Sequence, residues 1–350
     1  ATVLFPLPLP PQRPIIFIYN LRLPHCESVL SVLGFCSSVN YGIKYTILLY
    51  NSFYPIVKNF PVISRKSAYN LVKTRKRGGI TQMKKDDVAT KRRYFAAANG
   101  FTGFRNYFPA VFDSAKYRRI FVLKGGPGTG KSSLMKKVCA KVPDGAYRTE
   151  AIFCSSDPDS LDGVIVEGKG GRVAVLDGTA PHERDAVIPG AVDEIVNLKD
   201  AWDTGALEWR RAEIFSLTEE KAAHYRDAYR YLSAFGKTRK NSAAENEKCD
   251  LHAMREAIRS LIRHDAGEGF FCRCRLIRAF GCRGEVMLPT FSSLAARTYL
   301  LRGSTAHKAR LLREAVGIFE EENIPVTFAP SPFDPDVPDG ILAEAAGVAL

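Results

Sequence analysis

The sequence contains no apolar run long enough to cross a membrane. Its longest uncharged stretch, residues 28–43, includes Ser, Asn and Gly and falls short of the ~18–20 apolar residues that a membrane span needs. The sequence also lacks the CxxC and HxxxH spacings typical of zinc sites, although Cys272, Cys274 and Cys282 lie near one another. All eight cysteines are irregularly spaced in a chain too long to be a disulfide mini-protein. We therefore expect a cytoplasmic protein with reduced thiols, no metal at these cysteines and no membrane partner.

Acidic residues are almost absent from the first 82 positions, where Glu27 stands alone against ten Lys and Arg residues. The remaining chain holds 40 basic and 36 acidic residues, so only +4 of the total charge of +13 belongs to it. This small excess argues against a nucleic-acid partner. The motif "RGGITQM" places purine-rich Arg-Gly-Gly codons, typical of a bacterial ribosome-binding site, shortly before Met83. We expect the native protein to begin at Met83, and residues 1–82 to be translated upstream sequence with little structure.

The most informative stretch is "RRIFVLKGGPGTGKSSLMKKV". An apolar run, Ile120–Leu123, predicts a buried strand, and a helix-forming segment follows the glycines, which is the context that a P-loop requires. Glycines adopt backbone torsions that let successive N–H groups turn toward a phosphate, and the helix N-terminus adds partial positive charge. We predict these nucleotide-binding residues: Gly125, Gly126, Gly128, Thr129, Gly130, Lys131, Ser132 and Ser133.

A bound Mg²⁺ would need a second ligand besides the hydroxyl of Ser132. The segment "GRVAVLDGTAPH" supplies Asp177 directly after an apolar strand, so we predict ATP or GTP bound with Mg²⁺ at Ser132 and Asp177, and Lys131 on the phosphates. Many P-loop ATPases carry Glu after this Asp, but Gly178 follows here. Because that Glu usually serves as the catalytic base, three alternatives remain. Another residue supplies the base, hydrolysis is slow, or the phosphate passes to an acceptor other than water.

The segment "SSDPDSLDG" follows an apolar strand and is expected at the sheet edge where ligands of parallel α/β sheets bind. Asp157, Asp159 and Asp162 are candidates to position a water molecule, and they equally fit a Pro/Ser/Asp turn that caps a helix. His182 is a candidate to polarise the terminal phosphate, although a loop histidine without a catalytic role is the alternative. Arg184 and Arg239 are candidate arginine fingers.

The pattern Asp-Pro-Asp-x-x-Asp-Gly occurs twice, at residues 157–163 and 334–340. The same offset of 177 positions aligns Lys131 with Lys308, and further upstream "LIRAFGCRG" aligns with "FAAANGFTG" at an offset of 181. Because these matching segments occur in the same order in both parts of the chain, they predict a duplicated domain.

The second copy departs from a working phosphate loop. His307 stands at the position of Gly130, and Ala309 replaces the magnesium-binding Ser132. The chain also ends where the metal-binding Asp would follow. We therefore expect a degenerate and truncated second domain.

Between the copies, "LEWRRAEIFSLTEEKAAHYRDAYRYLSAF" and "AENEKCDLHAMREAIRSLIRHD" space apolar residues three and four apart, which predicts two amphipathic helices in a hairpin. The predicted fold class is α/β: a P-loop NTPase of three-layer αβα architecture with a mainly parallel sheet, duplicated, with a helical hairpin insertion. The predicted domains are residues 83–195, the insertion at 196–268 and the second copy at 269–350.

Four segments, "RYFAAANGFTGFRNYF", "LKGGPGTGKSSLMKK", "CSSDPDSLDGVI" and "LDGTAPH", resemble a bacterial family of tandem P-loop ATPase-like proteins. The resemblance covers residues 90–350. It implies two nucleotide-binding halves separated by helical segments, with ATP and Mg²⁺ at Gly125–Ser133 and Asp177. The altered loop at Gly303–Ala309 departs from that pattern, which places a second working site in doubt.

Three functions fit these features. The first is a Mg²⁺-dependent ATPase that couples hydrolysis to a conformational switch, with the helical hairpin contacting a protein partner and the halves pairing within or between chains. The second is a phosphotransferase whose acceptor binds at the Asp157–Asp162 loop. The third is a nucleotide-binding regulator without turnover, which the missing Glu after Asp177 favours over a fast ATPase.

Overall fold

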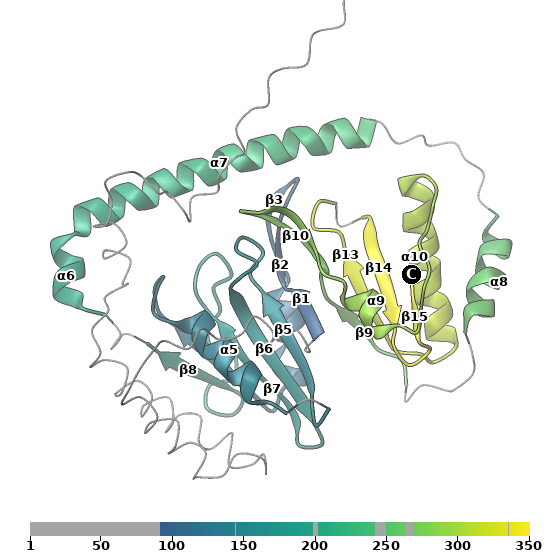
Figure 1. Ribbon diagram of the computed structural model, residues 1–350, viewed down its shortest axis with the longest axis horizontal. Helices are drawn as coiled ribbons and strands as arrows, with labels where there is room; N and C mark the ends of the chain where they lie inside the picture. Colours follow the sequence, from purple (N-terminus) through teal and green to yellow (C-terminus); the bar gives the residue numbers. More distant parts are fainter. Residues whose placement is uncertain (1–91, 144, 199–201, 242–249, 263–268, 335) are drawn as a thin grey trace, which may run out of the picture.

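The computed structural model describes residues 92–143, 145–198, 202–241, 250–262, 269–334 and 336–350, and shows a mixed α/β protein with two large sheets (Figure 1). The expected non-native segment, residues 1–82, lies outside the described residues. Within the described residues, no helix has both the length and the apolar character needed to cross a membrane.

The first sheet contains the strand that leads into the glycine loop. It has six strands in the order β1-β5-β6-β7-β4-β8, and β6 alone runs antiparallel to the other five. These strands are β1 (Arg92–Phe95), β4 (Arg119–Lys124), β5 (Arg148–Phe153), β6 (Leu161–Gly168), β7 (Gly171–Asp177) and β8 (Asp193–Asn197). The sheet therefore extends slightly beyond the predicted boundary at residue 195.

The second sheet repeats this arrangement with one strand fewer. Its order is β9-β13-β14-β15-β12, with parallel pairs at both ends and antiparallel pairs around β14, as in β1-β5-β6-β7-β4. These strands are β9 (Cys272–Cys274), β12 (Arg297–Thr298), β13 (Val326–Pro330), β14 (Pro338–Ala343) and β15 (Val348–Ala349).

A β-hairpin follows the first strand of each sheet. The hairpins are β2–β3 (Ala97–Gly100 and Gly103–Asn106) and β10–β11 (Arg278–Gly281 and Gly284–Met287). Phe95 and Leu276 lie just before the two hairpins. The Phe95 N–H donates to the Leu276 carbonyl at 2.8 Å, and the Leu276 N–H donates to the Phe95 carbonyl at 3.1 Å. These two residues are 181 positions apart, which is the offset of the aligned segments, so the two halves meet at equivalent positions.

The two sheets pack against each other through a shared core, and each has a long helix on its outer face (Figure 1). Helix α5 (Lys131–Lys141) covers the first sheet with Met135 and Cys139, and α10 (Thr305–Glu321) covers the second. The inner core joins Ile120 and Leu176 of the first sheet to Leu342 of the second, together with the short helices α4 (Phe108–Val111) and α9 (Thr290–Leu294). The layers therefore differ from the expected αβα order, because each inner face is covered largely by the other half.

The prediction of a helical hairpin is wrong. After the short α6 (Thr204–Trp209), α7 (Arg211–Asn241) crosses the β2–β3 hairpin, whereas α8 (Leu251–Leu261) packs on α10 (Figure 1). The apolar face of α8 is buried through Ile258 in the core of the second half, while α7 contacts Phe101 of the β2–β3 hairpin through Phe235. Each helix thus buries its apolar face on a different part of the protein.

Candidate functional site

The glycine loop, residues 125–130, joins the end of β4 to the start of α5. Gly128 and Gly130 have φ angles of 80° and 86°, in the left-handed region that favours glycine. Gly130 is the N-cap of α5, and no side chain caps this helix start. A helix start of this kind offers N–H donors and partial positive charge to an anion.

Lys131 lies at the centre of this loop and is largely buried. Its Nζ donates to the carbonyl oxygens of Gly125 and Gly126, at 2.5 and 3.0 Å, and lies 3.6 Å from Oδ2 of Asp177. Asp177 reaches this position because it is the last residue of β7 and is paired in register with Leu123 of the neighbouring parallel strand β4. The structure thus brings the two most strongly predicted site residues together.

The other predicted loop residues surround this pair. The Thr129 hydroxyl donates to the Gly126 carbonyl at 2.9 Å, which closes the loop on itself. Ser132 is half-buried and Ser133 is exposed in the first turn of α5. The Oγ of Ser132 accepts a hydrogen bond from the backbone N–H of Leu161 at 2.9 Å, so the predicted magnesium ligand contacts the acidic turn.

The acidic turn comprises residues Ser155–Leu161 and leads into β6, which begins at Leu161. The Asp157 carboxylate accepts from the Ser160 hydroxyl at 2.6 Å and from the Asp159 N–H at 3.2 Å, so it stabilises the turn itself. Asp159 is exposed and forms an ion pair with Arg283 of the second half. Of these two aspartates, only Asp159 presents its carboxylate outside the turn.

Asp162 and His182 form a buried pair beside the site. Nε2 of His182 lies 3.3 Å from Oδ2 of Asp162, and the imidazole stacks on Phe108 with ring centroids 4.2 Å apart. Burial lowers the pKa of His182, but the hydrogen bond and charge of Asp162 and the charge of Asp177 outweigh it, so the pKa is raised. Asp162 is therefore engaged by His182 rather than exposed for positioning water.

Gly178 directly follows Asp177 and is closely surrounded by other atoms. A Cβ atom at this position would lie 2.3 Å from Cγ1 of Val122 and 2.8 Å from the carbonyl oxygen of Arg184. The Arg184 oxygen is a backbone atom that cannot move aside easily. The local packing therefore excludes any side chain at position 178.

Arg184 does not behave as a free arginine finger. Its guanidinium donates to the Phe112 carbonyl at 2.5 Å and to the Asp193 carboxylate at 3.0 Å. The Arg184 side chain is buried by these contacts. The side chain of Arg239, the other candidate, lies outside the described residues.

Sequence reasoning missed Trp202. A Cβ atom on Gly126 would lie 2.8 Å from Cζ2 of Trp202, so the indole packs directly on the glycine loop. No motif marks this residue, because it follows β8 and reaches the loop only through the pairing of β8 with β4.

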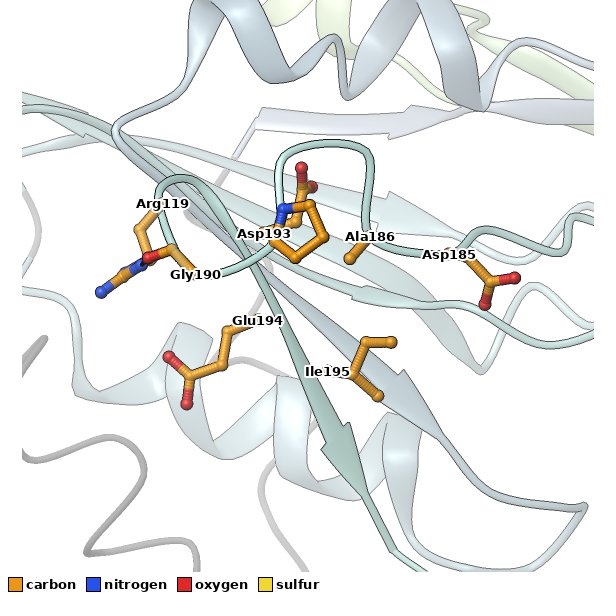
Figure 2. Close-up of a pocket in the computed structure, with 8 residues that line it drawn as sticks. Arg119, Asp185, Ala186, Gly190, Asp193, Glu194 and Ile195 are labelled. Carbon is orange, nitrogen blue, oxygen red and sulfur yellow. Dashed lines mark hydrogen bonds between the residues drawn. The ribbon is translucent and has the colours of Figure 1, made fainter.

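A separate pocket of about 530 Å³ lies along the edge strand β8 (Figure 2). It is lined by Arg119, Asp185, Ala186, Pro189, Gly190, Asp193, Glu194 and Ile195. Arg119 begins β4, whereas the glycine loop follows the opposite end of that strand. The pocket is therefore distinct from the predicted phosphate site.

Ser132 and Asp177 are the residues beside the loop that would hold a Mg²⁺ ion if one bound there. Among the described residues, no group of three or more His, Cys, Asp or Glu side chains could hold a metal ion. Ser132 and Asp177 supply one hydroxyl and one carboxylate. Mg²⁺ typically uses one or two such ligands and completes its shell with phosphate oxygens and water.

The equivalent region of the second half lacks the loop. Helix α10 already begins at Thr305, where the Ser304 hydroxyl caps it by accepting from the His307 N–H at 3.3 Å. Lys308 consequently lies inside the first turn, whereas Lys131 begins its helix. No family model, no curated protein and no solved structure matches the chain.

Proposed function

We propose that the chain is a P-loop NTPase that binds ATP, or GTP, with Mg²⁺ at the glycine loop and hydrolyses it slowly. The observation that carries this proposal is the position of Lys131. Its ammonium lies at the start of α5, within a loop of left-handed glycines, and 3.6 Å from the Asp177 carboxylate at the end of the adjacent parallel strand.

Each residue has a role that its surroundings support. Lys131 would exchange its contacts with the loop carbonyls for the β- and γ-phosphate oxygens, and the loop N–H groups would bind the same phosphates. Ser132 and Asp177 would hold Mg²⁺, which when bound neutralises charge on the transferring phosphoryl group. Asp159, the exposed carboxylate paired with Arg283, could orient the attacking water, and His182 would stabilise the phosphate side of the site when protonated.

We also propose that the two halves are copies of one unit, of which the first alone keeps the nucleotide site. The repeated strand order and the equal offsets of the hairpins support the duplication. The early start of α10 leaves no glycine loop in the second copy. The exposed Trp209, Phe215 and Tyr231 of α6 and α7 support the proposed protein partner, which would read the nucleotide state of the first half.

A regulator without turnover is the second candidate. The packing around Gly178, which excludes a catalytic Glu, favours it. A phosphotransferase with its acceptor near Asp159 is the third, favoured by the exposure of that carboxylate beside the site.

The test combines nucleotide binding with phosphate release in the full chain. Trp202 packs on the loop, so its fluorescence should change when Mg-ATP or Mg-GTP binds, and Trp209→Phe removes the other tryptophan of the chain. We expect a fluorescence change at micromolar nucleotide and slow release of phosphate. Binding without release would favour the regulator, and phosphate transferred only when an acceptor is added would favour the phosphotransferase. Absence of any binding would contradict all three.

A further inference from the structure

Each half of the chain places its β-hairpin against the acidic turn of the other half. At the tip of β10–β11, the Cys282 N–H donates to the Ser156 carbonyl at 2.9 Å. At the tip of β2–β3, the Phe101 N–H donates to the Phe333 carbonyl at 3.3 Å. The donors are 181 positions apart and the acceptors 177, so the two contacts are equivalent.

Glycines make both contacts possible. A Cβ atom on Gly281 would lie 2.5 Å from the Ser155 carbonyl oxygen, and one on Gly100 would lie 2.3 Å from the Pro332 carbonyl oxygen. Both obstacles are backbone atoms that cannot move aside easily. Any larger residue would therefore push the hairpin away from the turn.

In the first half, this contact leads directly to the phosphate site. The acidic turn that Cys282 contacts ends at Leu161, whose N–H donates to Oγ of Ser132 at 2.9 Å. A second contact lies on the same turn, where Arg283 at the hairpin tip forms an ion pair with Asp159. Behind the turn, the buried Asn99 donates to the Phe280 carbonyl at 2.8 Å and thereby ties the two hairpins together.

We propose that the second half controls Mg²⁺ binding at the first, with Arg283 as a positioning residue. This inference rests on the proposed nucleotide site. The hairpin β10–β11 holds the acidic turn so that the Leu161 N–H orients the Ser132 hydroxyl oxygen, which is the predicted magnesium ligand. The second half thereby acts as a regulatory partner built into the same chain.

The contact predicts a specific defect. The turn touches the site at Ser132, whereas the phosphates would be bound by the loop N–H groups and Lys131. Loss of the Arg283–Asp159 pair should therefore raise the Mg²⁺ concentration required for nucleotide binding. It should leave the affinity for ATP in EDTA unchanged. A contact that serves stability alone would not separate these two quantities.

A charge-swap cycle tests the pair in the full chain. We expect Arg283→Glu and Asp159→Arg each to raise the half-saturating Mg²⁺ concentration about three- to fivefold, the upper part of the range for exposed ion pairs, and the double variant to restore it. Arg230→Glu, which breaks an exposed ion pair with Asp227 on α7, is the matched control and should cause no change. Equal Mg²⁺ requirements in wild type and Arg283→Glu would overturn the proposal.

Hydrogen exchange tests the positioning without nucleotide. In Arg283→Glu, the Leu161 amide should exchange faster, because the turn that holds it against Ser132 has lost a restraint. Amides in β7 should be unaffected. If wild type binds no nucleotide, the proposed function fails on its own, and unchanged exchange at Leu161 would separately overturn the role of Arg283.

Discussion

At the scale of single residues, His182 connects the loop that follows β7 to Asp162 near the start of β6. The imidazole is buried between Phe108 and Asp162, and its pKa is raised despite burial because Asp162 favours the charged form. A group whose pKa is raised on folding stabilises the protein below its unfolded pKa of about 6.5, and this stabilisation is lost as the pH rises through the folded value.

We therefore expect His182→Gln to reduce the free energy of unfolding more at pH 5.5 than at pH 8.5. Urea denaturation of both proteins at the two pH values measures this difference. His224→Gln, on an exposed position of α7, is the matched control. A deficit that is equal at both pH values, or larger at pH 8.5, would show that the His182–Asp162 pair does not favour the charged imidazole.

Some residues of the candidate site could be predicted from sequence motifs, and others could not. The glycine pattern and the Asp after an apolar strand pointed to Lys131 and Asp177, which lie 3.6 Å apart in the structure because β7 pairs in register with β4. Trp202 and Arg283 reach the same region through pairing between distant elements, and no local pattern marks them.

At the scale of elements, α7 illustrates how a helix can be predicted while its partner is not. Its periodicity indicated an amphipathic helix, but amphipathic faces do not say which surface covers them. In the structure, Gly236 of α7 packs against the ring of Phe101, which in turn stacks on Phe333 with centroids 5.4 Å apart. The helix is therefore attached to the hairpin rather than to α8.

Two helical glycines provide a matched test of this attachment. A Cβ atom on Gly236 would lie 2.4 Å from Cγ of Phe101, whereas one on Gly317 of α10 would meet no atom within 4 Å. We expect Gly236→Ala to destabilise the protein, because overpacking costs roughly 1–3 kcal/mol and helix propensity returns only up to about 1 kcal/mol of it. Gly317→Ala should stabilise it by up to about 1 kcal/mol through helix propensity. Thermal denaturation measures both, and stabilisation by Gly236→Ala would contradict the docking of α7 on the hairpin.

At the scale of the whole molecule, the two halves share one core and a buried ion pair. Nε of Arg275, in the second half, donates to Oε2 of Glu150, in β5, at 2.7 Å, and both side chains are almost fully buried. Burial raises the pKa of Glu150, but Arg275 and Arg148 outweigh it and hold the pKa at about 2. The repeated motifs predicted two halves, yet they could not predict this interface, since neither Arg275 nor Glu150 lies within one of these motifs.

The central claim is that the first half alone binds a nucleotide through Lys131, and titration calorimetry with Mg-ATP tests it most directly. Lys308 is the matched control, since it occupies the position of Lys131 in the second half but lies inside α10. We predict that Lys131→Ala weakens binding at least tenfold, whereas Lys308→Ala binds as wild type does. Equal binding by wild type and Lys131→Ala, or a loss of binding in Lys308→Ala alone, would contradict the account.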